Sequence, residues 1–267
     1  MSTRIAIIAG GGILPWLLAD ALPDAVFVTI AGQEADIPDE ITSLRAEIER
    51  IGTLFADLRA AGVGAVVFAG ALIRPALDPA RFDDVMKGFA PRLIPALQSG
   101  DDALLREVVD LFEAQGFAVR APVDVLPELC LSEGEMLGRD MREDEAMDAI
   151  RGHEILATLA PLDLGQGCVV AAGLCLGIET LQGTDAMLRF VGQTPPALRR
   201  APGVLVKAPK RGQDMRVDMP AIGPDTITAA HEAGLAGIVI HAQGVMVLER
   251  DALEEALLAT GLFLAAL

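Results

Sequence analysis

Tyrosine is absent from this chain, and aromatic residues make up only 4% of its 267 residues. Apolar residues nevertheless reach 52%, so a large core has to be built mainly from Ala, Val, Leu and Ile. With 27 glycines, this composition is typical of α/β layering, in which helices pack closely on a sheet. The length allows either one large domain or two domains of ordinary size.

Long apolar runs are also missing. No stretch of about 18 uninterrupted apolar residues occurs, so no transmembrane helix is expected. The amino-terminal residues MSTRIAIIAGGG lack a signal-peptide pattern and instead predict a strand that runs into a glycine turn. The three cysteines, Cys130, Cys168 and Cys175, form no CxxC pair. We therefore expect a cytoplasmic protein whose thiols are reduced and packed as small hydrophobic side chains.

Positive charge is scarce, because 21 Lys and Arg face 38 Asp and Glu and the formal net charge is −17. This balance argues against nucleic acid as a partner and against electrostatic adsorption to an anionic bilayer. Any contact with lipid is therefore expected to be apolar and local. The histidines, His153, His231 and His241, are scattered without a metal-binding spacing, and each is expected to be structural.

One segment, residues 203–223, is rich in Lys and Arg although the chain as a whole is acidic. Its sequence is GVLVKAPKRGQDMRVDMPAIG. Four cations fall within ten residues, with two carboxylates close by: Lys207, Lys210, Arg211 and Arg216, beside Asp214 and Asp218. Such a mixture suits a phosphorylated ligand, with a metal on the carboxylates and Lys or Arg on the phosphate oxygens. A charged surface turn that joins two strands is the alternative, because ordinary ion-pair networks also concentrate charge.

The first half of the chain alternates strands with helices, which predicts a mostly parallel, Rossmann-like sheet with flanking helices. The apolar run Arg4–Ala9 leads into Gly10, Gly11 and Gly12 and then into a helical pattern. A strand, a glycine turn and a helix can direct backbone N–H groups at an anion. A tight turn without a ligand is the alternative, because the GxGxxG pattern is incomplete. Further strands are expected at 25–31, 46–51 and 65–69 and from 117, with helices at 53–61, 81–98 and 101–115.

Arg74 follows the predicted strand 65–69. Open α/β sheets bind ligands at the carboxyl ends of their strands, so Arg74 is a candidate ligand contact, with an ordinary surface arginine as the alternative. After residue 122 the composition changes, because prolines and glycines become frequent and the charged run RDMREDE follows. We expect an N-terminal domain at 1–130, a linker at 131–145 and a C-terminal mixed α/β domain at 146–267 that carries the cationic segment.

The predicted C-terminal domain opens with a helix over 146–159 and an apolar hairpin within 168–178, which Glu179 ends. Thr184 and Asp185 then precede a helix, and Thr184 is predicted to be its N-cap. The remaining elements are expected as a strand at 204–207, a helix from Pro224, a hairpin over 237–249, a helix at 250–260 and a strand at 262–266.

Several short motifs occur in a fixed order: IAGGG followed by LP, FAG followed by RP, GDDALLR, DLGQGCVV, GTDAMLR and KAPKRGQDMRVDMPAIG. Together they resemble the LpxI family, the UDP-2,3-diacylglucosamine pyrophosphatases of lipid A biosynthesis. The resemblance covers essentially the whole chain. It implies hydrolysis of UDP-2,3-diacylglucosamine to 2,3-diacylglucosamine 1-phosphate (lipid X) and UMP, with Mg²⁺ as the required metal.

The resemblance also implies residue roles. The family's essential aspartate lies in an RVDLP motif that reads RVDMP here, so it falls on Asp218. We expect Asp218 to bind Mg²⁺ or to orient the attacking water, and Lys207 and Lys210 to stabilise charge on the diphosphate. Glu179 and Asp185 are expected to supply further metal contacts, because they end apolar strand and turn elements in or near these motifs. The family often has proline where this chain has Arg211, so that position is a local variation.

Substrate binding is expected from six residues: Gly10, Gly11, Gly12, Arg74, Thr184 and Arg216. A cytoplasmic enzyme with this substrate would make transient contact with the inner membrane surface, and homo-oligomerisation is left open. A purely structural or interaction protein would leave the cationic segment unexplained, and two further alternatives remain. One is a nucleotide or sugar-nucleotide binding protein without hydrolytic activity. The other is a Rossmann-type oxidoreductase, which the lack of a convincing ribose-binding carboxylate after the second strand disfavours.

Overall fold

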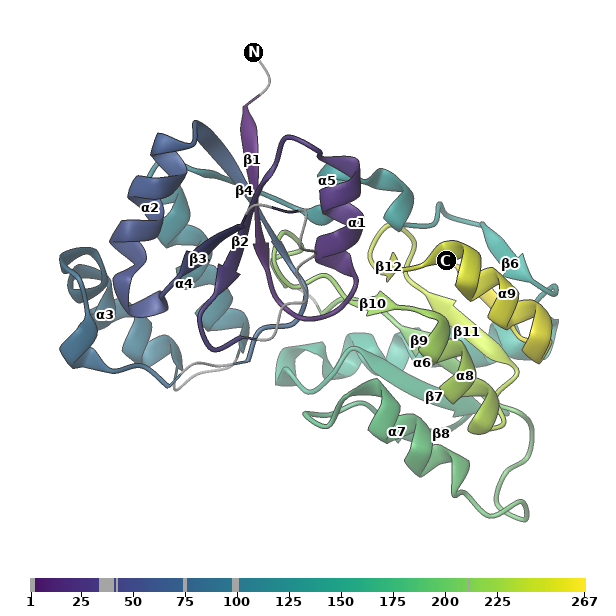
Figure 1. Cartoon of the computed structure of the whole chain (residues 1–267). Helices are drawn as coiled ribbons and strands as arrows, with labels where there is room; N and C mark the ends of the chain where they lie inside the picture. Colours follow the sequence, from purple (N-terminus) through teal and green to yellow (C-terminus); the bar gives the residue numbers. More distant parts are fainter. Residues whose placement is uncertain (1–2, 34–40, 42, 74–75, 98–100, 211) are drawn as a thin grey trace. The chain divides into compact units, whose positions relative to one another are not determined.

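The computed structural model describes residues 3–33, 41, 43–73, 76–97, 101–210 and 212–267. The chain forms two compact units. Unit 1 comprises residues 1–127 together with 214–218, and unit 2 comprises residues 128–213 and 219–267. Each unit combines a sheet with helices (Figure 1), which confirms the predicted fold class.

Unit 1 contains a five-stranded sheet in the order β3-β2-β1-β4-β5, and all its strand pairs are parallel. Its strands are β1 (Arg4–Ala9), β2 (Val26–Ile30), β3 (Ser43–Ala46), β4 (Val63–Ala69) and β5 (Ala118–Arg120). On one side of the β1–β4 pair the sheet continues from β1 through β2 to β3, and on the other side it continues from β4 to β5. The Rossmann-like, parallel character of this half is therefore confirmed, with the topological switch point between β1 and β4.

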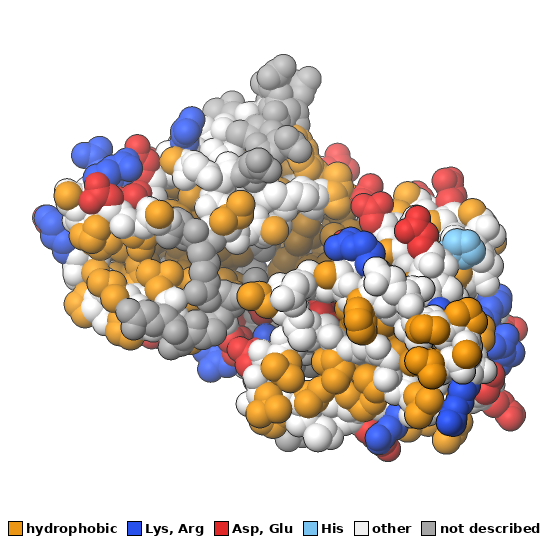
Figure 2. All heavy atoms as spheres, turned by 90° about the horizontal axis from the view of Figure 1, so that it is seen from below, with side chains coloured by type: hydrophobic (Ala, Val, Ile, Leu, Met, Phe, Trp, Pro, Cys, Tyr) orange, Lys and Arg blue, Asp and Glu red, His pale blue; other side chains and the backbone are white. Residues whose placement is uncertain are grey.

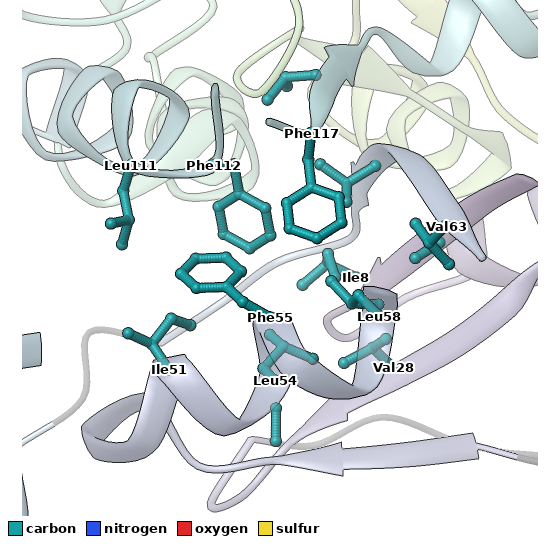
Figure 3. Close-up of a cluster of buried hydrophobic side chains, with 14 of the residues drawn as sticks. Ile8, Val28, Ile51, Leu54, Phe55, Leu58, Val63, Leu111, Phe112 and Phe117 are labelled. Carbon is teal, nitrogen blue, oxygen red and sulfur yellow. The ribbon is translucent and has the colours of Figure 1, made fainter. Parts of the chain in front are cut away.

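The helices of unit 1 are α1 (Leu14–Ala21), α2 (Ile51–Ala60), α3 (Asp84–Leu97), α4 (Asp101–Ala114) and α5 (Pro122–Val125), with short 3-10 turns at Ile48–Arg50, Pro79–Arg81 and Pro127–Leu129. Aromatic rings fill the core beneath α2 and α4 (Figure 3). The Phe55 ring meets Phe112 edge-on at 5.0 Å and stacks on Phe117 at 5.7 Å. Such pairs add to the free energy gained by burying their area.

The strand expected at 46–51 is wrong. Strand β3 ends at Ala46, and a 3-10 turn and α2 occupy the following residues. In α2, Ile51, Leu54, Phe55 and Leu58 are buried. Their spacing of three and four residues is helical, so the apolar Ile51 belongs to the helix rather than to a strand.

Unit 2 contains a six-stranded mixed sheet in the order β6-β13-β11-β9-β7-β8. Its strands are β6 (Met136–Gly138), β7 (Gly167–Ala171), β8 (Leu174–Ile178), β9 (Val204–Lys207), β11 (Gly237–Ile240) and β13 (Phe263–Ala266). Strands β9, β11 and β13 are parallel, and β7 is antiparallel to both of its neighbours. Strand β8 therefore runs in the same direction as β9. A separate pair joins β10 (Ala221–Ile222) to β12 (Met246–Val247) in parallel.

Helices cover both faces of the unit 2 sheet: α6 (Glu143–Leu159), α7 (Gly183–Gly192), α8 (Pro224–Glu232) and α9 (Arg250–Thr260), with a 3-10 turn at Ala160–Leu162. Alternate residues along β7 and β9 enter different cores, as the two-residue period of a strand requires. Val169 and Leu205 pack with residues of α7, α8 and α9, whereas Val170 and Val206 pack with residues of α6.

Two features of unit 2 differ from expectation. The hairpin predicted over 237–249 is wrong, because β11 pairs in parallel with β9 and β13 while β12 pairs with β10. The segment expected as a linker, 131–145, contains β6, which pairs with β13 in the main sheet. Arg139 also forms a bidentate ion pair with the buried Glu145, at 2.7 and 2.9 Å. The charged run that indicated a linker therefore forms an ion pair within unit 2.

The hairpin predicted within 168–178 is confirmed as β7 and β8. Of the three thiols, Cys168 is buried, and burial raises its pKa to about 12. Cys175 is exposed, so the prediction that all three cysteines pack internally is wrong for this one, because β8 lies at the edge of the sheet. None of the helices that the structure describes combines the length and the apolar character needed to cross a bilayer.

Candidate functional site

Charged and polar side chains meet at one edge of the unit 2 sheet. Strand β9 ends at Lys207, and β8, which runs in the same direction, ends immediately before Glu179. Strand β7 starts at Gly167 on the same edge, where the Glu179 backbone N–H donates to the Gly167 carbonyl. The carboxyl ends of parallel strands are where open α/β sheets bind ligands.

Lys207 is the centre of this edge. Its side chain is only 8% exposed, and its ammonium donates to the Thr184 hydroxyl at 2.6 Å. Glu179 Oε2 lies 3.6 Å from the same nitrogen, and the Glu179 side chain is 13% exposed. Within the described part of the chain, this oxygen accepts no hydrogen bond. A buried ammonium facing a carboxylate at this distance is an incompletely satisfied pair, with capacity to bind a further group.

Thr184 reaches Lys207 from the first turn of α7. The helix starts at Gly183 with Gln182 as its N-cap, so the prediction that Thr184 caps the helix is wrong. The N-cap therefore lies two residues before Thr184, and Gly183 between them has a positive φ of 83°, a conformation that favours glycine. The Thr184 hydroxyl is thereby free to serve Lys207. Asp185 is exposed in the same turn, where a carboxylate complements the helix dipole.

Lys210, three residues beyond Lys207, forms an ion pair with Asp163. Asp163 follows the 3-10 turn after α6 and has a φ of 50°. In the loop between this turn and β7, the Gln166 backbone carbonyl accepts a hydrogen bond from the Ala208 backbone N–H at 2.9 Å. The side-chain oxygen of Gln166 is buried and has no hydrogen-bond partner among the described residues. Sequence reasoning assigned no role to Asp163 or Gln166. Their signal is the DLGQG motif, which contains both.

The residues 214–218 belong to unit 1, although the flanking residues belong to unit 2. Arg216 donates to Asp214 and to Glu113, each at 2.7 Å, and Val217 packs against the unit 1 core. The Arg216 hydrogen bonds hold the pKa of the Asp214 carboxyl below its usual range. Asp218 is half-buried, and its backbone N–H donates to the Asp214 carbonyl at 3.1 Å. The Arg216 guanidinium thus anchors the segment that carries Asp218, and its predicted contact with substrate stays a prediction.

The glycine turn after β1 is closed by main chain from the loop after β4. The N–H groups of Gly10 and Gly11 donate to the carbonyls of Ala69 and Ala71, each at 2.8 Å. A side chain at Gly10 would collide with the Ala71 carbonyl. Gly10 is therefore needed for this close backbone contact. A role for Gly10, Gly11 or Gly12 in binding substrate stays a prediction, and Arg74 lies outside the described residues.

Comparison with known proteins identifies the family. The model of the LpxI N-terminal domain matches residues 4–129, and the model of the LpxI C-terminal domain matches residues 132–265. This chain belongs to the LpxI family. The UDP-2,3-diacylglucosamine pyrophosphatase LpxI of Caulobacter vibrioides is 40% identical to it over 268 residues, which cover 97% of this chain and 96% of that protein. The resemblance inferred from the ordered motifs is thereby confirmed.

The predicted metal residues of this LpxI-family chain do not form a ready-made cage. Among the described residues, no group of three or more His, Cys, Asp or Glu side chains is placed to hold a metal. Mg²⁺ in phosphate-processing sites usually takes one or two carboxylates together with phosphate oxygens and water. The buried Glu179 oxygen without a hydrogen bond fits such a partial site. The donor set is therefore compatible with a metal that is held jointly by protein and substrate.

Proposed function

We propose that this protein hydrolyses the diphosphate bond of UDP-2,3-diacylglucosamine and releases 2,3-diacylglucosamine 1-phosphate and UMP. The Caulobacter relative is named as an enzyme that acts on this substrate. The observation that carries the proposal to this chain is the buried Lys207, which Thr184 and Glu179 hold at the carboxyl edge of the sheet.

The chemistry requires positive charge at a fixed place. A diphosphate is a negatively charged anhydride, and charge on its phosphoryl oxygens has to be neutralised as the bond to the leaving group breaks. An ammonium has three donors, and Thr184 accepts one of those of Lys207. The others are available to phosphate oxygens in this proposal. Lys210, which pairs with the half-exposed Asp163, supplies a second cation in the same segment.

Asp218 is assigned the central role, because it occupies the aspartate of the RVDMP motif. It orients the attacking water or holds Mg²⁺, with Glu179 and Asp185 as further candidate ligands. When bound, Mg²⁺ would neutralise charge on the phosphate oxygens. Arg216 holds the loop through its contacts to Asp214 and Glu113, so the Asp218 carboxylate is presented on an anchored segment.

The place of action follows from the substrate. Its acyl chains reside in a membrane, so a protein that consumes it makes at least transient contact with a lipid surface. We propose a cytoplasmic enzyme that meets the inner membrane from that side. The apolar transfer energy of about 0.8 kcal/mol per buried CH₂ favours long acyl chains without any charge attraction.

The test is hydrolysis by the purified protein. UDP-2,3-diacylglucosamine dispersed in detergent is incubated with Mg²⁺ or with EDTA, and the nucleotide product is identified by chromatography. The proposal predicts UMP, with no UDP, and a rate that EDTA lowers by orders of magnitude. Tight binding of the lipid nucleotide with no UMP release would instead identify a non-hydrolytic binding protein.

A further inference from the structure

Two glycines of the DLGQG motif, Gly165 and Gly167, lie directly against Glu179, and we call them the glycine cradle. The Glu179 backbone N–H donates to the Gly167 carbonyl at 2.8 Å. A side-chain carbon at Gly165 would lie 2.1 Å from the Glu179 carbonyl oxygen, and one at Gly167 would lie 2.6 Å from Glu179 Oε2. The glycine cradle therefore contacts Glu179 both at its main chain and at the tip of its side chain.

The backbone conformation of the cradle does not itself require glycine. Neither Gly165 nor Gly167 has a positive φ. Gly167 is the first residue of β7, and glycine weakens a strand because it loses more conformational freedom on folding and has no side chain to pack. The need for glycine at these two positions therefore comes from the space that Glu179 occupies.

The two contacts differ in what can move. At Gly165 the obstacle is main chain, since the Glu179 carbonyl carbon is also only 2.6 Å away. At Gly167 the one obstacle closer than 3 Å is Oε2, the far end of a flexible side chain. The next atoms, Glu179 Cβ and Met187 Cε, lie at 3.6 Å, which is ordinary van der Waals contact. An added methyl group at position 167 thus fits the strand if the carboxylate turns away.

The position of this carboxylate matters because of Lys207. Glu179 Oε2 lies 3.6 Å from the Lys207 ammonium and accepts no hydrogen bond within the described part of the chain. Figure 2 shows Lys and Arg side chains on the outer surface of the molecule, whereas the Lys207 side chain is only 8% exposed. A buried ammonium whose facing carboxylate moves away loses the charge that compensates it and helps to fix its position.

We propose that Gly167 is a positioning residue for the reaction, because its lack of a side chain lets the Glu179 carboxylate face Lys207 and hold the ammonium in place. The inference rests on the proposed function, in which Lys207 neutralises charge on the diphosphate. Such stabilisation requires a charge that is fixed before the reaction begins, and a misplacement of about 1 Å can cost about 100-fold in rate.

A double-variant cycle tests the inference through kcat and KM for UMP release. Gly167→Ala should lower kcat about ten-fold or more and change KM less than about two-fold, because Lys207 acts on charge that develops in the transition state. Aspartate is one methylene shorter than glutamate, so its carboxylate does not reach the space of the added methyl group. In the Glu179→Asp background, Gly167→Ala should therefore change kcat by less than about two-fold. Equal losses in both backgrounds, or wild-type turnover of Gly167→Ala, would overturn the inference.

Thermal unfolding separates a positioning role from a role in folding. Gly167→Ala should unfold within about 2 °C of the wild type, since only the tip of a side chain has to move. Gly165→Ala, which meets main chain, should unfold at least about 5 °C lower. A loss for Gly167→Ala as large as that for Gly165→Ala would show that Gly167 serves the strand, and would overturn the inference.

Crystal structures of the wild type and Gly167→Ala test the placement without any need for hydrolysis. The inference predicts that Glu179 Oε2 moves more than about 4 Å from the Lys207 ammonium, beyond the range of an ion pair. This movement in a protein whose wild type releases no UMP would support the placement and overturn the proposed reaction. A carboxylate that keeps its wild-type position in Gly167→Ala, with UMP release intact in the wild type, would overturn the inference and leave the reaction standing.

Discussion

Units 1 and 2 present the same architectural edge, the carboxyl ends of parallel strands, but place different chemistry there. In unit 1, Gly10 and Gly11 pair through their main chain with Ala69 and Ala71. In unit 2, the edge is occupied by side chains, with Lys207 held by Thr184 and facing Glu179. The comparison teaches that the fold supplies the location, whereas the side chains placed on it decide which edge can neutralise a phosphate.

The cores differ as well. Seven of the nine phenylalanines fall within residues 1–127, and their rings fill the core of unit 1. In unit 2 only Phe263 is buried, whereas Phe190 is exposed. The core of unit 2 is therefore mainly aliphatic, and the Phe190 ring lies on the surface of the unit.

The largest effect is expected at the charged edge. Lys207→Met keeps the length of the side chain but removes its charge, and should lower kcat for UMP release by about 100-fold or more. Lys87→Met, at a lysine that is 62% exposed on α3, is the control and should leave turnover unchanged. Because Lys207→Met leaves Glu179 buried without its partner, the double variant with Glu179→Gln is measured beside it. Near wild-type turnover in a folded Lys207→Met protein would remove Lys207 from the reaction.

In unit 1, substitutions where the two loops approach each other should lower the stability of the protein. Gly70 has a φ of 86°, and an added side chain would meet the Gly11 carbonyl. Gly70→Ala is therefore expected to lower the free energy of unfolding by about 3 kcal/mol. Gly88→Ala, in α3 with open space around it, should instead stabilise by about 0.5–1 kcal/mol. Chemical denaturation followed by circular dichroism measures both, and equal stability of the two variants would contradict the close approach of the two loops.

A buried ion pair in unit 2 should give a smaller, pH-dependent effect. Burial alone would raise the pKa of Glu145, but hydrogen bonds from Arg139 and from the Arg142 backbone outweigh it and hold the pKa below its ordinary value. Glu145→Gln is therefore expected to cost about 2 kcal/mol at pH 7. Because the folded pKa is depressed, this difference is present above pH of about 4.3 and shrinks as the pH falls below it.

Urea denaturation of the wild type and Glu145→Gln across this pH range tests that expectation. Asp144→Asn is the matched control, because Asp144 is 68% exposed and pairs with the exposed Arg142. Its stability should stay close to that of the wild type, because an exposed ion pair contributes little. A stability difference for Glu145→Gln that grows in acid would contradict the sign of the pKa shift.

The smallest effect is expected where Glu113 meets Arg216. Their side chains are 45% and 37% exposed, and Arg216 retains Asp214 when Glu113 is lost. Glu113→Gln should therefore cost less than about 1 kcal/mol and change turnover by less than about two-fold. UMP release at low and high salt measures this. A large loss of kcat would show that this pair, rather than the Asp214 contact alone, positions the loop of Asp218.

Local patterns predicted the elements whose signals lie within a few residues. Strand β9 at 204–207, helix α9 at 250–260 and the β7–β8 hairpin were all predicted from the sequence and are found in the structure. The partners of β11 and β12 could not be derived in this way. Both strands pair in parallel with distant segments, and a parallel partner leaves no local turn in the sequence.

The same reason limits prediction of the site. Glu179, Thr184 and Lys207 lie on three different elements, and only the sheet topology brings them together. Charge concentration identified the lysine segment, and the ordered motifs identified the family. Neither signal could indicate that Asp163 pairs with Lys210, or that residues 214–218 belong with unit 1, because both depend on long-range packing.

The most direct test of the account is UMP release from UDP-2,3-diacylglucosamine by Asp218→Ala beside Asp225→Ala. Asp225 is an exposed aspartate at the start of α8, seven residues further along the chain, and serves as the matched control. The account predicts that Asp218→Ala loses turnover by orders of magnitude while its unfolding midpoint stays close to that of the wild type, and that Asp225→Ala keeps its activity. Near-normal UMP release by a folded Asp218→Ala protein would contradict it.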